Sequence, residues 1–325
     1  MVNILLNLLF LIIGMVFLIK GADFFVEGAS NVAKALKIPS LIIGLTLVSI
    51  GTSLPELSVS VNSALQNASD MSFGNVVGSN IFNVLVVIGA SALFTPMIVS
   101  KTIKKFDIPV VIGLYLVLTL FAFVISPNKI TLVEGLIILV LFVIYLTFLV
   151  IRSKKEATEE EEVEEKPTKK WWVNVIFIIL GLAGIIAGGE FVVTTASALA
   201  IKFGMSELLV SLTIVAVGTS LPELVTSMVA AKKGENDIAV GNAIGSCLFN
   251  ISLILGISAM FNPLTIQTSS LVDVLVMILC VGLVLLFAFK SDKVNKTCGG
   301  IMVAIYVIYL VYIVLRNIYP QYFAF

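Results

Sequence analysis

The heptapeptide GTSLPEL occupies residues 51–57 and occurs again, unchanged, at residues 218–224. Each copy places a proline and a carboxylate inside a strongly apolar stretch. Proline has no backbone N–H and its ring clashes with the preceding helical turn, so we expect Pro55 and Pro222 to kink or break a helix. The carbonyls that such a break frees need a polar partner, because unpaired polar groups are costly in apolar surroundings. The repeated heptapeptide therefore predicts two broken helices around a polar site.

The composition of the chain is that of a membrane protein. Of its 325 residues, 59% are hydrophobic and only 12% are charged, and the mean hydropathy is +1.13. About one quarter of the residues in a soluble domain are charged. Apolar runs long enough to cross a bilayer recur along the whole chain, which predicts an all-α, multi-pass membrane protein. The sequence contains no histidine, so the commonest proton relay and transition-metal ligand is missing.

Ten transmembrane helices are predicted, five on each side of an acidic linker at 152–170. Their approximate ranges are 3–33, 39–66, 72–95, 106–126, 131–151, 171–201, 206–231, 238–261, 269–289 and 298–316. The linker has almost no apolar residues and contains a block of glutamates, which is typical of a solvated segment. The chain thus divides into a first five-helix repeat (1–151), the linker (152–170) and a second repeat (171–325).

The two halves are copies of one another. Residues 41–97 align with 208–264 without a gap, and 25 of these 57 positions are identical, including glycines, prolines, asparagines and glutamates. Five crossings per half mean that the second copy enters from the opposite face, so we expect an inverted repeat with broken helices 2 and 7 at its core.

The lysines and arginines indicate the orientation of the chain. Most of them fall in loops that lie on one side of this plan, including the linker. Because positive charge accumulates on the cytoplasmic side, we expect a multi-pass protein of the cell membrane with both termini outside and the linker inside.

Glu56 and Glu223 lie roughly midway along the two broken helices. A carboxylate at that depth costs about 2.5–3.5 kcal/mol on insertion scales. A single such residue is explained equally well by a protonated glutamate hydrogen-bonded between helices. Two of them, related by the repeat, favour a functional site.

A second repeated motif follows each glutamate, GNVVGSNIFN at 74–83 and GNAIGSCLFN at 241–250. Its glycines are four residues apart, a spacing that allows close packing of membrane helices. Ser79 and Asn83, and likewise Ser246 and Asn250, share one helix face and could aim oxygens at the neighbouring glutamate. Hydrogen bonds between helices are the alternative explanation for these four polar residues.

Together the repeats supply two carboxylates, several hydroxyls, amide oxygens and freed carbonyls. An all-oxygen site with two negative charges suits a hard cation such as Ca²⁺, which takes roughly 6–8 oxygen ligands in irregular geometry. Mg²⁺ fits less well because it resists dehydration. Asp273, by contrast, lies near a helix end, where a carboxylate can reach water.

At these residues the sequence closely resembles the prokaryotic sodium/calcium exchangers of the calcium/cation antiporter superfamily. The doubled GTSLPE and GNxxGSxxFN segments are similar to that family's two alpha repeats, and the five-plus-five helix plan matches over the whole chain. The resemblance implies electrogenic exchange of outgoing Ca²⁺ for incoming Na⁺ at a mid-membrane site. It also implies that the first and sixth helices slide across the rest to alternate access.

The resemblance further implies roles for individual residues. Ca²⁺ would be held by Glu56, Glu223 and the carbonyls of Thr52 and Thr219. Sodium would be held by the Ser49 carbonyl, Thr52, Ser53, Glu56 and Ser79, and symmetrically by the Ala216 carbonyl, Thr219, Ser220, Glu223 and Ser246. Asn83 and Asn250 would line the middle position.

Other functions remain open at this point. Some relatives carry aspartate at position 250, notably the potassium-dependent branch, so Asn250 argues against K⁺ co-transport. Proton-coupled relatives typically replace GTSLPE with a different acidic repeat, so the motif favours Na⁺ over H⁺. A cation channel is a less favoured alternative, since inverted, broken architecture suits alternating exposure of one site. No nucleophile–base pair accompanies the glutamates, so we do not expect an enzyme. We expect no cofactor and no nucleic-acid partner, only the bilayer and the transported ions, with a monomer as the functional unit.

Overall fold

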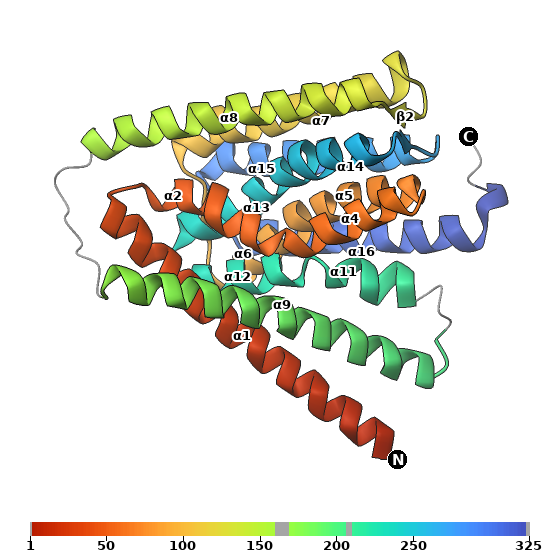
Figure 1. The fold of residues 1–325 in the computed structure, drawn as a ribbon, viewed down its shortest axis with the longest axis horizontal. Helices are drawn as coiled ribbons and strands as arrows, with labels where there is room; N and C mark the ends of the chain where they lie inside the picture. Colours follow the sequence, from red (N-terminus) through yellow and green to blue (C-terminus); the bar gives the residue numbers. More distant parts are fainter. Residues whose placement is uncertain (1, 160–168, 206–209, 323–325) are drawn as a thin grey trace.

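The structure, a computed structural model, describes residues 2–159, 169–205 and 210–322 and is almost entirely helical (Figure 1). The first half contains α1 (Val2–Leu36), α2 (Ser40–Ile43), η1 (Gly44–Val48), α3 (Ser49–Thr52), α4 (Leu54–Leu65), α5 (Ser69–Phe82), η2 (Asn83–Ile88), α6 (Gly89–Phe94), η3 (Ile103–Asp107), α7 (Ile108–Leu120), η4 (Phe121–Ile125) and α8 (Leu132–Glu159). The second half contains α9 (Trp171–Lys202), η5 (Ser211–Val215), α11 (Ala216–Gly218), α12 (Leu221–Lys232), α13 (Asn236–Phe249), η6 (Asn250–Ile254), α14 (Leu255–Phe261), α15 (Ser270–Ser291), α16 (Lys296–Ile318) and a short 3₁₀ turn, η7 (Pro320–Tyr322). The segments η1 to η6 are π-helical turns that continue the α-helices beside them.

Eight helices in the described residues are long and apolar enough to cross a membrane. A ninth span results if Ser40–Thr52 and Leu54–Leu65, which are bent by 49° relative to one another, are counted together. The predicted all-helical membrane architecture is therefore confirmed. The predicted count of ten is not reached within the described ranges, because the predicted helix 206–231 begins at residues 206–209, which are not described. The predicted fifth helix runs on to Glu159, into the predicted linker, and residues 160–168 lie outside the described part of the chain.

The helices differ sharply in how deeply they are buried. In the most apolar windows of Ser69–Phe94 and Asn236–Phe261, 78% of the residues are buried inside the protein. The corresponding fractions are only 17% for Ile4–Leu36 and 22% for Trp171–Lys202. Figure 1 shows α1 and α9 along one side of the bundle and α8 along the opposite side. The GNxxGSxxFN segments thus form the centre, and α1 and α9 form an edge.

Glycines allow α1 and α9 to pack backbone against backbone. A Cβ atom on Gly181 would lie 2.5 Å from the backbone nitrogen of Phe25, and one on Gly188 would lie 2.5 Å from that of Leu18. Such contact is typical of membrane helices with small residues at their interface. The two helices run in opposite directions (Figure 1).

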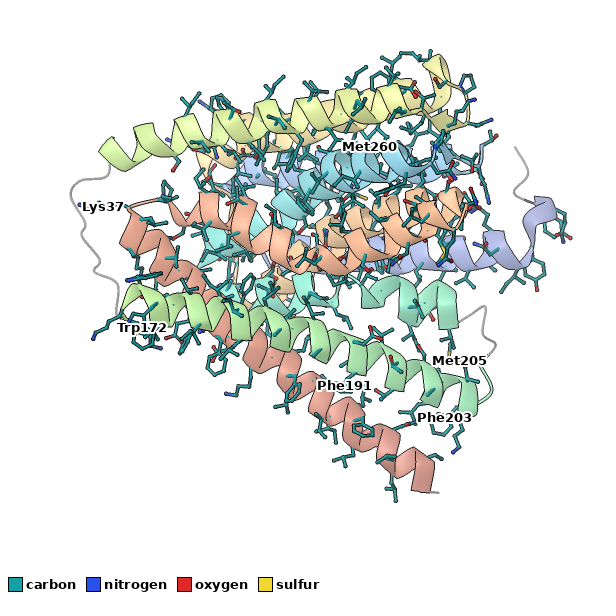
Figure 2. All side chains as sticks on the ribbon, viewed as in Figure 1. Lys37, Trp172, Phe191, Phe203, Met205 and Met260 are labelled. Carbon is teal, nitrogen blue, oxygen red and sulfur yellow. The ribbon has the colours of Figure 1, made fainter. Side chains whose placement is uncertain are left out.

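Exposed aromatic side chains lie at both ends of α9. Trp172 is 50% exposed near its first residue, and Phe203 is 74% exposed just beyond its last. Figure 2 shows the two side chains at opposite ends of the helix. Tryptophan gathers where a membrane meets water, so Trp172 indicates the level of one interface.

Two short antiparallel sheets connect the halves. Strand β1 (Met97–Ile98) pairs with β4 (Lys293–Val294), and β2 (Lys129–Ile130) pairs with β3 (Leu264–Thr265). Strands β1 and β2 precede and follow the span that contains α7, so the two sheets lie at opposite ends of that span. Each sheet therefore joins a first-half strand to a second-half strand.

A buried ion pair joins α8 to the start of the α7 span. Arg152 Nη1 and the hydroxyl of Tyr145 each lie 3.0 Å from Oδ1 of Asp107. The aspartate is fully buried and the arginine is 8% exposed. The sequence interpretation did not identify this cluster.

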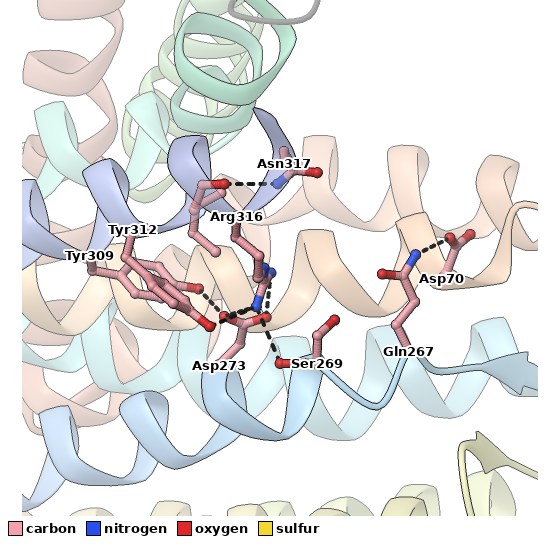
Figure 3. Close-up of polar contacts among 9 residues, drawn as sticks. Asp70, Gln267, Ser269, Asp273, Tyr309, Tyr312, Arg316 and Asn317 are labelled. Atoms are coloured by element: carbon pink, nitrogen blue, oxygen red, sulfur yellow. Dashed lines mark hydrogen bonds and ion pairs between the residues drawn. The ribbon is translucent and has the colours of Figure 1, made fainter. Parts of the chain in front are cut away.

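The second half contains the same cluster. Arg316 Nη2 pairs with Asp273 Oδ2 at 2.9 Å, and the hydroxyl of Tyr309 donates to Oδ1 at 3.1 Å (Figure 3). Asp273 is only 7% exposed, so the expectation that this carboxylate reaches water is wrong. It binds α16 to α15 instead.

Candidate ion-binding site

Both copies of the heptapeptide interrupt a helix, as predicted. The first helix ends at α3 and resumes at α4, with Ser53 between them at φ −86° and ψ 8°. In the second half Ser220, at φ −96° and ψ 6°, precedes α12 in the same way. Pro55 and Pro222 occupy the second position of the new helices, where a missing N–H costs nothing. Each proline also leaves the carbonyl four residues earlier without its helical donor.

Glu56 and Glu223 lie in the first turns of α4 and α12. Both side chains are fully buried. The backbone N–H groups at a helix N-terminus favour negative charge, so each break places a carboxylate where the helix itself helps to stabilise it.

The two halves exchange hydrogen bonds at these glutamates. Ser53 Oγ donates to Glu223 Oε1 at 2.8 Å, and Ser220 Oγ donates to Glu56 Oε1 at 2.9 Å. The serines are as deeply buried as the carboxylates. Each glutamate therefore contacts the break in the other half, and the two breaks form one site.

The other carboxylate oxygens have no hydrogen bond to any described residue. Oε2 of Glu56 and Oε2 of Glu223 are both buried and without a donor. Thr219 Oγ1, Ser246 Oγ and Asn250 Oδ1 share this condition within the described ranges. A buried carboxylate oxygen without a donor is costly, and a bound cation removes that cost. The five atoms are all oxygens, the ligands that Ca²⁺ and other hard cations take.

Ser79 and Ser49 occupy different positions relative to this centre. Ser79 Oγ lies 3.1 Å from Ser220 Oγ, so it belongs to the group around Glu56. Ser49 Oγ donates to Leu45 O at 2.9 Å and so points back into its own helix, and its carbonyl accepts the N–H of Ser53 at 3.1 Å. The hydroxyl of Thr52 also lies 3.4 Å from that carbonyl oxygen.

Ala216 begins α11, and the structure describes only its backbone. Thr52 Oγ1 lies 3.0 Å from Asn242 Oδ1, so the threonine of the first break contacts the second motif of the other half. Ser49 directs its side-chain oxygen into its own helix, but its predicted role used the carbonyl.

Two asparagines that the sequence interpretation did not select donate hydrogen bonds to the backbone carbonyls of the glutamates. The amide of Asn75 donates to Ser60 Oγ at 2.9 Å and to the Glu56 carbonyl at 3.4 Å. Asn242 makes the equivalent bonds, to Ser227 Oγ at 2.9 Å and to the Glu223 carbonyl at 3.3 Å. Their repetition in both GNxxGS motifs was the signal that could have identified them.

Asn83 and Asn250 begin the π-helical turns η2 and η6. Both are fully buried. A π-helical turn inserts a residue into the α-helical pattern and is common at functional sites. The widened turns explain how two inner helices place amides, rather than apolar groups, at the centre of the protein.

The glycines of the second GNxxGS motif pack closely, as expected. A Cβ atom on Gly241 or Gly245 would lie 2.7–3.0 Å from backbone atoms of α2 and η1. By the repeat, the segment equivalent to α2 and η1 is 207–215, and residues 207–209 lie outside the described ranges. The close packing expected of Gly74 and Gly78 therefore stays a prediction.

The acids of α1 lie away from this centre. Asp23 forms an ion pair with Lys233 at 2.7 Å, and Glu27 pairs with Lys169. Ser30 Oγ donates to Glu235 Oε1 at 2.5 Å. The contacts of Lys233 and Glu235 tie α1 to the connection between α12 and α13, beside a cavity of about 290 Å³, and the contact of Lys169 ties it to the start of α9.

The chemistry of the centre differs from that of a protein-bound transition metal. No group of three or more His, Cys, Asp or Glu side chains within the described ranges could hold a metal ion. The centre offers two carboxylates supplemented by hydroxyl and amide oxygens, a donor set suited to hard cations that enter and leave.

Comparison with known proteins agrees with this chemistry. Residues 6–151 and 173–315 match the family model described as sodium/calcium exchanger protein. The putative antiporter CaxA of Alkalimonas amylolytica is 38% identical over 86% of this chain and 90% of its own. The sodium/calcium exchanger MaX1 of Methanosarcina acetivorans is 32% identical over 87% and 91%, respectively.

A solved structure shows the same fold. The sodium-calcium exchanger NCX_Mj, soaked with Na⁺ and Sr²⁺, superimposes with a TM-score of 0.81 at 32% identity, covering 95% of this chain and 98% of its own. The buried, oxygen-lined centre and these matches lead to one conclusion: the chain belongs to the sodium/calcium exchanger family and is a membrane antiporter of Ca²⁺ and other cations.

Proposed function

We propose that this protein exchanges Na⁺ for Ca²⁺, with Ca²⁺ leaving the cell as Na⁺ enters. The observation that carries the proposal is the pair of buried Oε2 atoms of Glu56 and Glu223, which have no hydrogen-bond donor among the described residues. Two carboxylates balance one divalent cation, or several monovalent cations that replace it. Exchange of more than two Na⁺ for each Ca²⁺ would move net charge and make transport electrogenic.

The roles of the individual ligands follow the symmetry of the site. We assign Ca²⁺ to Glu56 and Glu223 with the carbonyls of Thr52 and Thr219. Sodium would be shared among the hydroxyls, the glutamates and the carbonyls at positions 49 and 216, on either side of the same centre. The crossed bonds from Ser53 and Ser220 support this assignment, because they bring both breaks to one place.

The proposed architecture is ten spans in two inverted repeats. The opposite directions of α1 and α9 support it, as does the pairing of each short strand with a strand of the other half (Figure 1). With the termini outside, residues 152–170 lie in the cytoplasm of a cell-membrane protein that works as a monomer.

The proposed mechanism is alternating access to this one central site. The tight contact of Gly241 and Gly245 with η1 lies at the end of the protein that we assign to the cytoplasm. It supports a carrier, which closes one side of its site at a time, over a channel. The helices α1 and α9, which pack against each other along one side of the bundle (Figure 1), are the elements that would slide.

The experiment that tests the coupling ion is Ca²⁺ uptake into proteoliposomes with Na⁺, K⁺ and H⁺ gradients imposed one at a time. We expect uptake with a Na⁺ gradient alone, accompanied by a membrane potential that a potential-sensitive dye reports. Uptake driven by H⁺, or a strict requirement for K⁺, would replace this proposal with a proton- or potassium-coupled antiporter. Conductance without coupling would indicate a channel.

A further inference from the structure

Asn80 departs from the symmetry of the two central motifs. It stands in GNVVGSNIFN where the second half has Cys247 in GNAIGSCLFN. The side chain is fully buried between α5 and the second half of the protein. A buried amide at a position where the repeat has a small apolar residue needs a physical reason.

Two contacts fix the orientation of the Asn80 amide. Its Nδ2 lies 3.7 Å from Sδ of Met277, and its Oδ1 accepts a hydrogen bond of 3.2 Å from Asn250 Nδ2. A thioether sulfur can only accept, so the NH₂ end of Asn80 belongs on the side of Met277. The oxygen of Asn80 must then face Asn250.

This orientation determines which end of Asn250 faces the ions. Because Asn80 presents an acceptor, Asn250 must turn its NH₂ group toward Asn80. Its Oδ1 is thereby directed elsewhere, and this buried oxygen has no hydrogen bond within the described ranges. The chain of contacts from Met277 through Asn80 thus leaves one amide oxygen available to a cation.

The equivalent asparagine in the first half has no such support. Neither the nitrogen nor the oxygen of the Asn83 amide has a hydrogen bond to a described residue. The Cys247 thiol, which replaces Asn80 in the second half, contacts the backbone oxygen of Asn80 at 3.8 Å. Among the contacts of the described residues, the amide at position 250 is therefore held in one orientation and that at position 83 is not.

We propose that Asn80 is a positioning residue for cation binding, which acts through Asn250 by holding that amide with its oxygen toward the ions. The proposal rests on the proposed function for the ligand role of Asn250. It also explains why this chain has asparagine at 250: a carboxylate there would face the Oδ1 of Asn80 and repel it. Asn80 and Asn250 therefore form a matched pair that sets the charge of the middle position.

The test is a double-mutant cycle on cation binding and transport. Asn80→Ala should weaken Ca²⁺ binding to the purified protein, measured by titration calorimetry, by about three- to tenfold, the range expected for one lost hydrogen bond. The same change made in an Asn250→Ala background should have no further effect, because the two residues act as a unit. In an Asn83→Ala background it should keep its full effect.

A second variant and a folding check distinguish loss of the positioning contact from loss of the fold. Met277→Leu conserves volume but removes the acceptor that orients Asn80, so it should weaken binding in the same direction and by a smaller factor. Size-exclusion elution and melting temperature in detergent show that each variant is folded. If Asn80→Ala is not folded, Asn80→Cys, the residue at the equivalent place in the second half, replaces it in the cycle.

Two results would overturn the inference: unchanged Ca²⁺ binding in folded Asn80→Ala, or an equal loss in the Asn250→Ala background. The second would show that Asn80 acts through packing alone. Failure of the proposed Na⁺ coupling would give a different result. The wild-type protein would then bind Ca²⁺, and the Asn80 and Asn250 variants would change that binding as expected, but a Na⁺ gradient would drive no Ca²⁺ uptake.

Discussion

Ser220 Oγ donates a 2.9 Å hydrogen bond to Oε1 of Glu56, a residue 164 positions earlier in the chain. The bond occupies one carboxylate oxygen and leaves Oε2 free of donors among the described residues. Together with its counterpart between Ser53 and Glu223, it means that the carboxylate of each glutamate is oriented by the opposite half.

Replacement of either glutamate by glutamine should abolish Na⁺-driven Ca²⁺ uptake. Glu56→Gln and Glu223→Gln remove one negative charge each while they conserve size, so the site can no longer balance a divalent cation. We expect both variants to fold, as judged by detergent size-exclusion elution. Glu190→Gln changes an exposed glutamate of α9 and is the control, with uptake close to that of the wild type. Wild-type flux from Glu56→Gln would contradict the ligand assignment.

Loss of either crossed hydrogen bond should weaken cation affinity to a similar degree. Ser53→Ala and Ser220→Ala each remove a hydroxyl that bonds a carboxylate, an interaction of about 1.5–3 kcal/mol, so apparent affinity should fall by about tenfold or more. The KM for Ca²⁺ in proteoliposomes measures the effect. Ser58→Ala, an exposed position on α4, should leave the KM unchanged. A loss confined to one of the two serines would show that the two halves contribute unequally.

The ion pairs of α1 should bias the protein toward a closed cytoplasmic side. Lys233 bonds Asp23, and Glu235 accepts from Ser30, so both hold α1 against the connection between α12 and α13. In Lys233→Gln we expect an increase of about two- to fivefold in apparent affinity for cytoplasmic Ca²⁺, the range for a partly exposed pair. Inside-out vesicles measure it.

The neighbouring change Lys232→Gln serves as the control for this prediction. Lys232 lies 4.8 Å from the ring centroid of Phe94 and has no ion pair with α1 in the described structure. It should leave the affinity unchanged. A decrease for Lys233→Gln would mean that the ion pairs favour the opposite state.

The two Asp–Tyr–Arg clusters should contribute unequally to stability. Asp107→Ala removes a fully buried carboxylate from an arginine whose side chain is only 8% exposed, whereas Asp273→Ala leaves Arg316 at 16% side-chain exposure, where water reaches it more easily. Breaking a buried pair costs about 3–5 kcal/mol, so we expect a clear fall in melting temperature for Asp107→Ala and a smaller one for Asp273→Ala. Thermal shift in detergent gives the order; the reverse order would show that burial does not decide it.

The sequence predicted the breaks because proline has local and strict consequences for a helix. Glu56 and Glu223 could be identified because a carboxylate in an apolar helix is costly and is kept only where it has a role. Two of them at equivalent positions of the repeat indicate a common role. The crossed bonds could not be predicted, since they join residues 164 and 170 positions apart and depend on how the breaks meet.

Other features were missed for different reasons. Asn80 was overlooked because its role depends on Met277, a residue of α15 that no motif connects to it. The ion pairs of Asp107 and Asp273 were missed because they lie outside the gapless alignment of the halves. The π-helical turns at both motif asparagines have no signature in composition or hydropathy.

The pairing of β1 with β4 and of β2 with β3 has a consequence for biosynthesis. When the first half has left the ribosome and entered the membrane, both of its strands still lack their partners, and Glu56 still lacks its serine. Strand β2 and Glu56 gain their partners before α15 is made, but β1 cannot pair until β4, which lies between α15 and α16, has been made. Synthesis therefore ends before folding can finish, and a chain truncated after α14 would remain an open target for membrane proteases.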